Sequence, residues 1–100
     1  MQAFIRQIQA ISTPEQASEL LAEHIELSPT IHHAITIATN AHTNQFRKSG
    51  EPYIIHPILV ACIVANIVCE EAMVIAALLH DVVEDTATTI EELETDFVKM

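Results

Sequence analysis

Four polar side chains close a strongly apolar run in the stretch Ala76-Ala77-Leu78-Leu79-His80-Asp81-Val82-Val83-Glu84-Asp85. On an α-helix, positions 80, 81, 84 and 85 share one face, while Val82 and Val83 turn away from it. A neighbouring imidazole and carboxylate can bind the same divalent ion, and such a mixed nitrogen and oxygen set suits transition metals better than magnesium or calcium. The stretch therefore predicts a helix with a coordination site on its polar face.

A third candidate ligand lies upstream, at His56 in the segment Tyr53-Ile54-Ile55-His56-Pro57. Pro57 suits the first turn of a helix, where a missing amide hydrogen leaves no intrahelical bond unmade, so His56 should lie near an exposed helix N-terminus. A lone His-Asp pair is usually an ordinary surface or capping pair. Charged groups at the end of a buried segment need partners, however. We therefore expect His56, His80 and Asp81 to form one ligand set.

Two separated motifs extend this pattern, Arg47-Lys48-Ser49-Gly50-Glu51-Pro52-Tyr53-Ile54-Ile55-His56-Pro57 and Ala76-Ala77-Leu78-Leu79-His80-Asp81-Val82-Val83-Glu84-Asp85-Thr86. In order and spacing they resemble the hydrolase domain of RelA/SpoT-type alarmone enzymes, within the all-helical His-Asp (HD) phosphohydrolases. The resemblance runs from about Ala41 to Glu92, roughly half of the chain. It implies a manganese-dependent enzyme of the stringent response that removes the 3′-pyrophosphate of (p)ppGpp and yields GDP or GTP.

The same resemblance implies three kinds of site residue: metal ligands for one Mn²⁺ per site (His56, His80, Asp81), a catalytic acidic pair (Glu84, Asp85) and a substrate-binding segment (Arg47, Lys48, Ser49). The chemistry agrees with these roles. A bound cation lowers the pKa of water, and a nearby carboxylate orients the attack or accepts a proton. Two carboxylates would repel a pyrophosphate unless cationic groups offset their charge, and Arg47 and Lys48 meet that need.

The chain departs from the family pattern at two points. Asn44 occupies a position where the family usually carries glycine, and asparagine is the non-glycine residue that best tolerates positive φ. The family also has a fourth metal ligand, an aspartate on a later helix, and no such segment precedes Met100. We therefore expect residues 1–100 to be a single domain, the N-terminal part of the hydrolase domain truncated before that helix, and weakly active or inactive alone.

Hydrophobic periodicity and capping residues predict an all-α fold, a partial HD domain built as a multi-helix bundle of about six helices. A single glycine and four prolines argue against disorder and against a turn-rich β protein. The one clear loop is expected at residues 48–52. The predicted helices cover residues 1–11, 14–27, 29–47, 57–69, 71–85 and a last segment from Thr88 or Thr89 through Phe97.

Charge and hydropathy narrow the range of partners. Four basic residues against fourteen acidic ones give a net charge of −10, which disfavours nucleic acid and favours a small anionic ligand at Arg47 and Lys48, half of all the basic residues. Asn66 and the Glu70-Glu71 pair divide the apolar stretch from Ile58 to Leu79 into pieces too short for the roughly 20 residues of a membrane span. No secretory signal is visible, so a cytoplasmic location is expected.

The remaining histidines and the cysteines receive no catalytic role. Cys62 and Cys69 lie two turns apart on one expected helix, about 10 Å at the α-helical rise, so they cannot pair and are interpreted as buried apolar cysteines. The role of His42 stays open: it either contacts the site or packs within the helices. His24, His32 and His33 are left unassigned.

Three functions remain in competition. The favoured one is an enzyme, a guanosine-3′,5′-bis(diphosphate) 3′-pyrophosphohydrolase. The alternatives are an HD phosphohydrolase for another nucleotide, and a non-catalytic nucleotide-binding or regulatory domain of a bifunctional (p)ppGpp synthetase. The presence of all five motif residues from His56 to Asp85 favours turnover. An attached synthetase region with GTP pyrophosphokinase activity and a homo-oligomeric state stay open.

Overall fold

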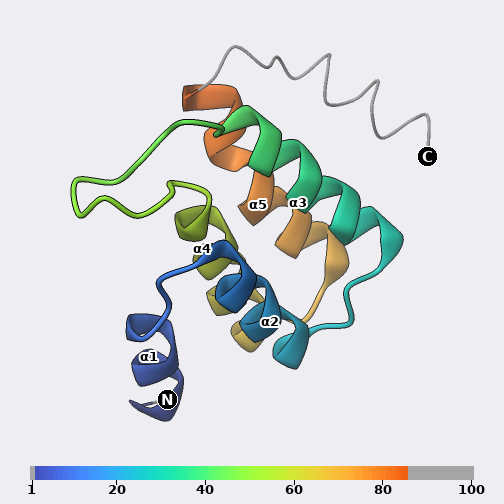
Figure 1. Cartoon of the computed structure of the whole chain (residues 1–100). Helices are drawn as coiled ribbons and strands as arrows, with labels where there is room; N and C mark the ends of the chain where they lie inside the picture. Colours follow the sequence, from blue (N-terminus) through green and yellow to red (C-terminus); the bar gives the residue numbers. More distant parts are fainter. Residues whose placement is uncertain (1, 86–100) are drawn as a thin grey trace.

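The computed structural model describes residues 2–85 and, within them, the side chains of residues 3–82. Residues 2–85 form five helices: α1 (Gln2–Gln9), α2 (Pro14–His24), α3 (Pro29–Ala41), α4 (Ile55–Ile67) and α5 (Glu71–Asp85), as Figure 1 shows. The prediction of an all-α fold is confirmed. The predicted last helix, from Thr88 or Thr89 through Phe97, lies outside the described residues.

The starts of α2 and α3 follow from capping side chains. The Thr13 hydroxyl accepts a hydrogen bond from the Gln16 amide at 3.2 Å, and the Gln16 side chain accepts one from the Thr13 amide at 3.3 Å, which completes a capping box. Ser28 caps α3 in the same manner, accepting from Ile31 at 3.2 Å. A proline follows each cap, where its fixed φ suits a first helical turn. Both predicted starts are confirmed.

The predicted end of α3 at Arg47 is wrong, because α3 ends at Ala41 with His42 as its C-cap. Asn44 then takes a φ of 66°, the left-handed conformation that commonly terminates helices. A helix cannot continue through that residue. The tolerance of positive φ expected of Asn44 is confirmed, and its consequence is that Arg47 lies in a loop.

The loop between α3 and α4 is longer than the predicted residues 48–52 and folds back on itself as a narrow hairpin. The Tyr53 amide donates to the Gln45 carbonyl at 2.8 Å, and the Arg47 amide donates to the Glu51 carbonyl at 2.9 Å. At the tip, Gly50 has a φ of 94° and donates to the Arg47 carbonyl at 2.8 Å. These bonds hold residues 47–49 at the outer end of the loop and Tyr53 at its base.

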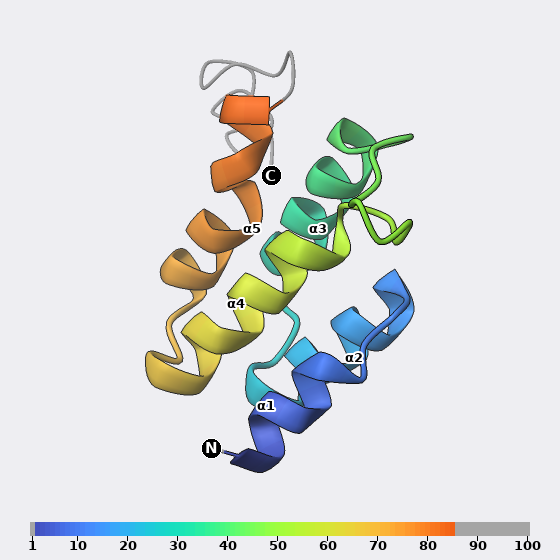
Figure 2. The ribbon, with the colours of Figure 1, turned by 90° about the vertical axis from the view of Figure 1, so that its left-hand side faces the viewer.

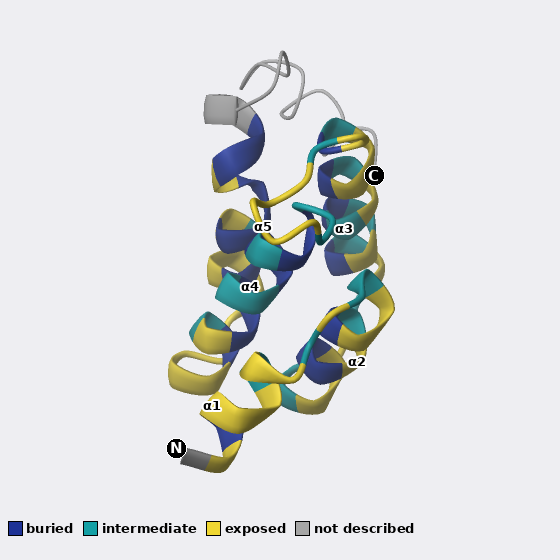
Figure 3. Ribbon diagram, turned by 60° about the vertical axis from the view of Figure 1, so that its left-hand side comes forward, coloured by how far each residue is buried: buried dark blue, intermediate teal, exposed yellow. Residues whose placement is uncertain are grey.

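Helices α4 and α5 form an antiparallel pair joined by residues 68–70, with α2 packed on α4 and α3 packed on α5 (Figures 1 and 2). α4 begins at Ile55, two residues before the predicted start, and Pro57 still falls in its first turn. The buried residues face one another across these contacts (Figure 3). The largest fully buried side chains include Leu21, Ile31, Ile58 and Leu78, one from each of the four packed helices.

The two cysteines differ in environment. Both are free, as predicted, and Cys62 is buried in the core. The prediction that Cys69 is buried is wrong, because α4 ends at Ile67 and Cys69 falls in the exposed connection to α5. None of the helices among the described residues is long and apolar enough to cross a membrane.

Candidate active site

The antiparallel pairing of α4 and α5 brings the predicted metal ligands to one end of the bundle. His56 lies eleven residues before the end of α4 at Ile67, and His80 lies nine residues after the start of α5 at Glu71. At the α-helical rise these separations are about 16 and 14 Å, so the two residues stand at similar heights above the connecting turn. The helix lengths, together with the short turn, therefore position the histidines side by side.

Asp81 lies between the two imidazoles. Its Oδ1 atom is 3.0 Å from Nε2 of His80, and its Oδ2 atom is 3.7 Å from Nε2 of His56. The Asp81 side chain is 9% exposed, whereas those of His56 and His80 are 38% and 51% exposed. The three predicted residues are thus brought together, with a buried carboxylate at the base and two rings toward solvent.

Among residues 3–82 no group of three or more His, Cys, Asp or Glu side chains is arranged to hold a metal ion. The two imidazoles face different oxygens of the Asp81 carboxylate. The donor atoms of these three residues, imidazole nitrogens and carboxylate oxygens, are of the types that suit a transition metal.

Tyr53 is a further residue of the site that the sequence analysis did not single out. Its hydroxyl donates a hydrogen bond of 3.0 Å to Oδ2 of Asp81. Its ring lies 5.7 Å, centroid to centroid, from that of His56 and 4.9 Å from that of His42. The signal available in the sequence was its position three residues before His56, one helical turn away.

His42 packs beneath Tyr53 and is 3% exposed. Its Nδ1 atom lies 3.0 Å from Oε1 of Gln45, a contact in which the amide oxygen is the acceptor. Nε2 is buried and has no hydrogen-bond partner within the described part of the chain. His42 therefore contacts a residue that binds Asp81 and does not itself reach the candidate ligands.

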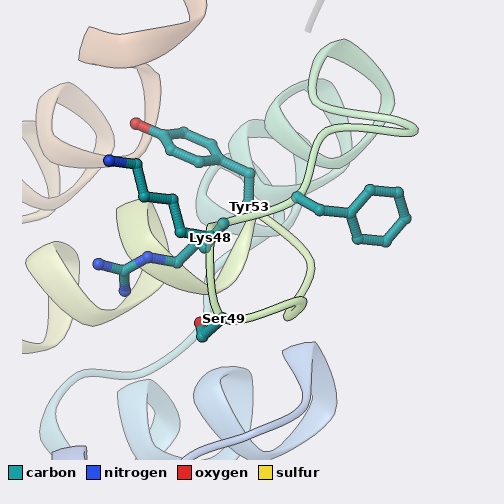
Figure 4. A pocket seen from close by; sticks show the side chains of 5 residues that line it. Lys48, Ser49 and Tyr53 are labelled. Carbon is teal, nitrogen blue, oxygen red and sulfur yellow. The ribbon is translucent and has the colours of Figure 1, made fainter.

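The predicted substrate-binding segment lines an open pocket of about 480 Å³ together with Phe46 and Tyr53. Figure 4 shows Ser49 at the loop, with the side chains of Lys48 and Tyr53 extending in the same direction. Arg47, Lys48 and Ser49 are all exposed. Because Tyr53 both lines this pocket and bonds to Asp81, the cationic pocket and the His-Asp cluster adjoin.

The predicted catalytic pair, Glu84 and Asp85, lies in the last turn of α5. Their side chains are outside the described part of the structure, so their catalytic role stays a prediction.

This site falls within the part of the chain that matches a known protein family. The family model described as HD domain matches residues 34–99, which include α4, α5 and the loop before them. The chain belongs to the HD-domain family. The matched segment contains all eight predicted site residues of this HD domain.

Relatives of this HD-domain chain include bacterial enzymes of (p)ppGpp metabolism. A guanosine-3′,5′-bis(diphosphate) 3′-pyrophosphohydrolase of Haemophilus influenzae is 56% identical over 61 residues, 61% of this chain and 9% of the relative. The protein of the same name in Aquifex aeolicus is 42% identical over 87 residues, 87% of this chain and 12% of the relative. The bifunctional (p)ppGpp synthase/hydrolase SpoT of Escherichia coli is 50% identical over 66 residues, 66% of this chain and 9% of the relative. The chain spans about a tenth of the length of these relatives.

Proposed function

We propose that this HD domain belongs to a (p)ppGpp 3′-pyrophosphohydrolase and that residues 1–100 are the N-terminal part of one hydrolase domain. The reaction would use water to release the 3′-pyrophosphate of (p)ppGpp, leaving GDP from ppGpp or GTP from pppGpp. The observation that carries the proposal is a His-Asp-His cluster that adjoins a pocket lined by Arg47 and Lys48. The names of the relatives support the substrate. A guanine nucleotide substrate also fits a cytoplasmic location, which we include in the proposal.

Membership in the HD-domain family implies dependence on a divalent metal ion, and we propose one Mn²⁺ per site. His56, His80 and Asp81 would hold it, because imidazole nitrogens and a carboxylate are donors that suit a transition metal. When bound, the cation supplies Lewis acidity, which lowers the pKa of water and offsets phosphate charge. The two exposed rings leave one side of the cluster open to solvent and to substrate.

The substrate phosphates would bind at Arg47, Lys48 and Ser49. A chain with a net charge of −10 repels a polyanion over most of its surface, so the paired cations matter more here than in a basic protein. Arg47 and Lys48 each present N–H donors that form short, charge-assisted hydrogen bonds with phosphate oxygens. The hairpin of the loop presents all three residues on one tip, where an extended anion can reach the cluster through the pocket beside Tyr53.

Glu84 and Asp85 would act on the attacking water. Positions 81, 84 and 85 follow helical spacing in the sequence, which supports a common role for these three residues. A carboxylate within hydrogen-bond reach of water orients it and accepts its proton as the phosphorus is attacked. We propose that role for the pair.

The test is pyrophosphate release from ppGpp, measured with Mn²⁺ and after metal removal, in the 100-residue chain and in any longer chain of which it is a part. Release is expected to require the metal and to be lost on His80→Ala and Asp81→Ala. His32→Ala, an exposed histidine on α3, is the matched control and should retain activity. Metal-independent release, or release that survives Asp81→Ala, would contradict the proposal.

The second candidate is a domain that binds nucleotide and regulates an attached synthetase without turnover. It is supported by a probable GTP pyrophosphokinase of Mycobacterium leprae, 42% identical over 83 residues. Binding of ppGpp with no release of pyrophosphate in every chain length would favour this candidate. Release from another nucleotide in preference to ppGpp would instead favour an HD phosphohydrolase with a different substrate.

A further inference from the structure

We infer that Tyr53 is a positioning residue for the metal ligands, acting through the hydrogen bond from its phenol to Asp81. The inference rests on the proposed metal centre and deepens it, because it concerns how that site keeps its geometry. Tyr53 is the only residue described that both lines the cationic pocket and contacts a proposed ligand through a hydrogen bond.

The phenol acts on one defined atom. Oδ2 of Asp81 accepts the hydrogen bond from Tyr53 at 3.0 Å and is also the oxygen that His56 approaches at 3.7 Å. The other oxygen, Oδ1, faces His80 at 3.0 Å. With one oxygen fixed by the phenol, the carboxylate cannot rotate freely about its terminal torsion, which is otherwise broad for aspartate. The hydrogen bond therefore fixes the orientation of the carboxylate, with one oxygen toward each imidazole.

The phenol is itself held in place from two directions. The Tyr53 amide donates to the Gln45 carbonyl at 2.8 Å, which fixes the backbone at the base of the loop. The buried ring of His42 packs on the tyrosine ring, and its Nδ1 lies 3.0 Å from the Gln45 side chain. Gln45 thus anchors both the tyrosine backbone and the ring beneath it. The hydroxyl has little freedom to leave Asp81.

Outer hydrogen bonds of this kind orient metal-ligating carboxylates, and their loss typically lowers metal affinity about 10–100-fold. Tyr53→Phe is the informative change, because it removes the hydroxyl and keeps the ring that contacts His42 and His56. A tyrosine that served only as packing would tolerate this change with no effect on the metal.

The experiment measures Mn²⁺ affinity from the electron paramagnetic resonance signal of the free ion. Tyr53→Phe should bind Mn²⁺ about tenfold more weakly than the unaltered chain. Phe46→Leu is the matched control, because Phe46 lines the same pocket without an interaction with Asp81 among the contacts described, and its affinity should not change. Thermal unfolding followed by circular dichroism establishes that each variant is folded.

A second readout needs no variant of Tyr53. The chain contains one tyrosine and no tryptophan, so its ultraviolet emission reports on Tyr53 alone. Saturation with Zn²⁺, a diamagnetic probe, should change this emission, because an ion bound to Asp81 withdraws charge from the carboxylate that accepts the phenolic hydrogen. The change should be absent in Asp81→Asn.

The outcomes separate the two proposals. Equal Mn²⁺ affinity in folded Tyr53→Phe and the unaltered chain would overturn the positioning role and leave the metal centre standing. Failure of the unaltered chain to bind Mn²⁺ would overturn the metal centre and this inference with it. If Tyr53→Phe does not fold, a Zn²⁺-dependent emission change in the unaltered chain supports the inference, and an unchanged emission at saturation refutes it.

Discussion

Nε2 of His56 lies 3.7 Å from Oδ2 of Asp81, although the two residues are far apart in the chain. The contact joins the first turn of α4 to the end of α5, so it exists only while these helices pack against each other. Any change that separates α4 from α5 should therefore also disperse the candidate metal ligands.

Asp81→Asn should leave the fold intact and remove metal binding. The substitution preserves the shape of a mostly buried side chain and its capacity to accept the hydrogen bond from Tyr53. It removes the charge and the favoured oxygen donor. Mn²⁺ affinity should therefore fall by more than about 100-fold, which exceeds the loss expected when only a hydrogen bond to a metal ligand is removed. Calorimetric titration with Mn²⁺ measures the effect. Unchanged affinity would exclude Asp81 as a ligand.

Lys48→Ala should weaken ppGpp binding by about tenfold or more, the effect expected when a phosphate loses one charge-assisted hydrogen bond. The loss should shrink as ionic strength rises, because salt screens exposed charges. Fluorescence anisotropy with a labelled ppGpp analogue at two salt concentrations tests both points. Arg6→Ala on α1 removes the same charge at a distance from the pocket and serves as the control. Equal losses in the two variants would indicate a net-charge effect only.

Ile58→Ala should destabilise the protein by about 2–5 kcal/mol, because it empties a fully buried position between α4 and its neighbours. Ile63→Ala removes the same atoms from the same helix at a position that is 42% exposed, so its cost should be below about 1 kcal/mol. Urea unfolding followed by circular dichroism gives both free energies. Similar values for the two variants would contradict the burial pattern of α4.

Asn44→Ala should destabilise the protein by about 1 kcal/mol, because alanine adopts the left-handed conformation less readily than asparagine. Asn44→Gly should be neutral or stabilising, since glycine has no Cβ to strain at a φ of 66°. Thermal unfolding of the pair measures the difference. A ranking with alanine above glycine would contradict a left-handed backbone conformation at this position.

The two cysteines should react at different rates with a thiol reagent. Burial raises the pKa of the Cys62 thiol from 9.0 to about 12, so at pH 8 the folded protein should expose one reactive thiol, that of Cys69. The folded state holds the Cys62 proton more tightly than the unfolded chain. This contribution to stability is therefore complete below pH 9 and is lost as the pH rises toward 12. Rapid modification of two thiols without denaturant would contradict this assignment.

The sequence was sufficient for the capped starts of α2 and α3 and insufficient for the start of α4 and the end of α3. Thr13 and Ser28 are caps whose hydrogen bonds depend only on local spacing, so both starts are as predicted. The apolar stripe of α3 ran on toward Arg47, and the preference of Asn44 for positive φ was recognised without being used to end the helix. The backbone preference of Asn44 therefore outweighed the apolar periodicity of α3.

The candidate site was predictable where chemistry and motif spacing coincide. His80 and Asp81 are adjacent, and His56 was added from the first-turn proline and the resemblance; the structure brings all three together. Tyr53 was not predicted, because its position three residues before His56 indicates proximity to that imidazole and not a hydrogen bond to Asp81. Its proposed role rests on a hydrogen bond to Asp81, which is 28 positions away in the sequence. The packing of α4 on α5 brings the two residues together.

The short connection between α4 and α5 has a consequence for how this segment can change during evolution. Residues 68–70 lie at the end of the helix pair opposite the histidines, so lengthening that turn need not alter which faces of the two helices meet. Insertion of one residue within α4 between Pro57 and Ile67, by contrast, would turn His56 by about 100° relative to the residues that pack on α5. Lineages that retain the site should therefore vary in length at the turn and keep both helices free of insertions and deletions.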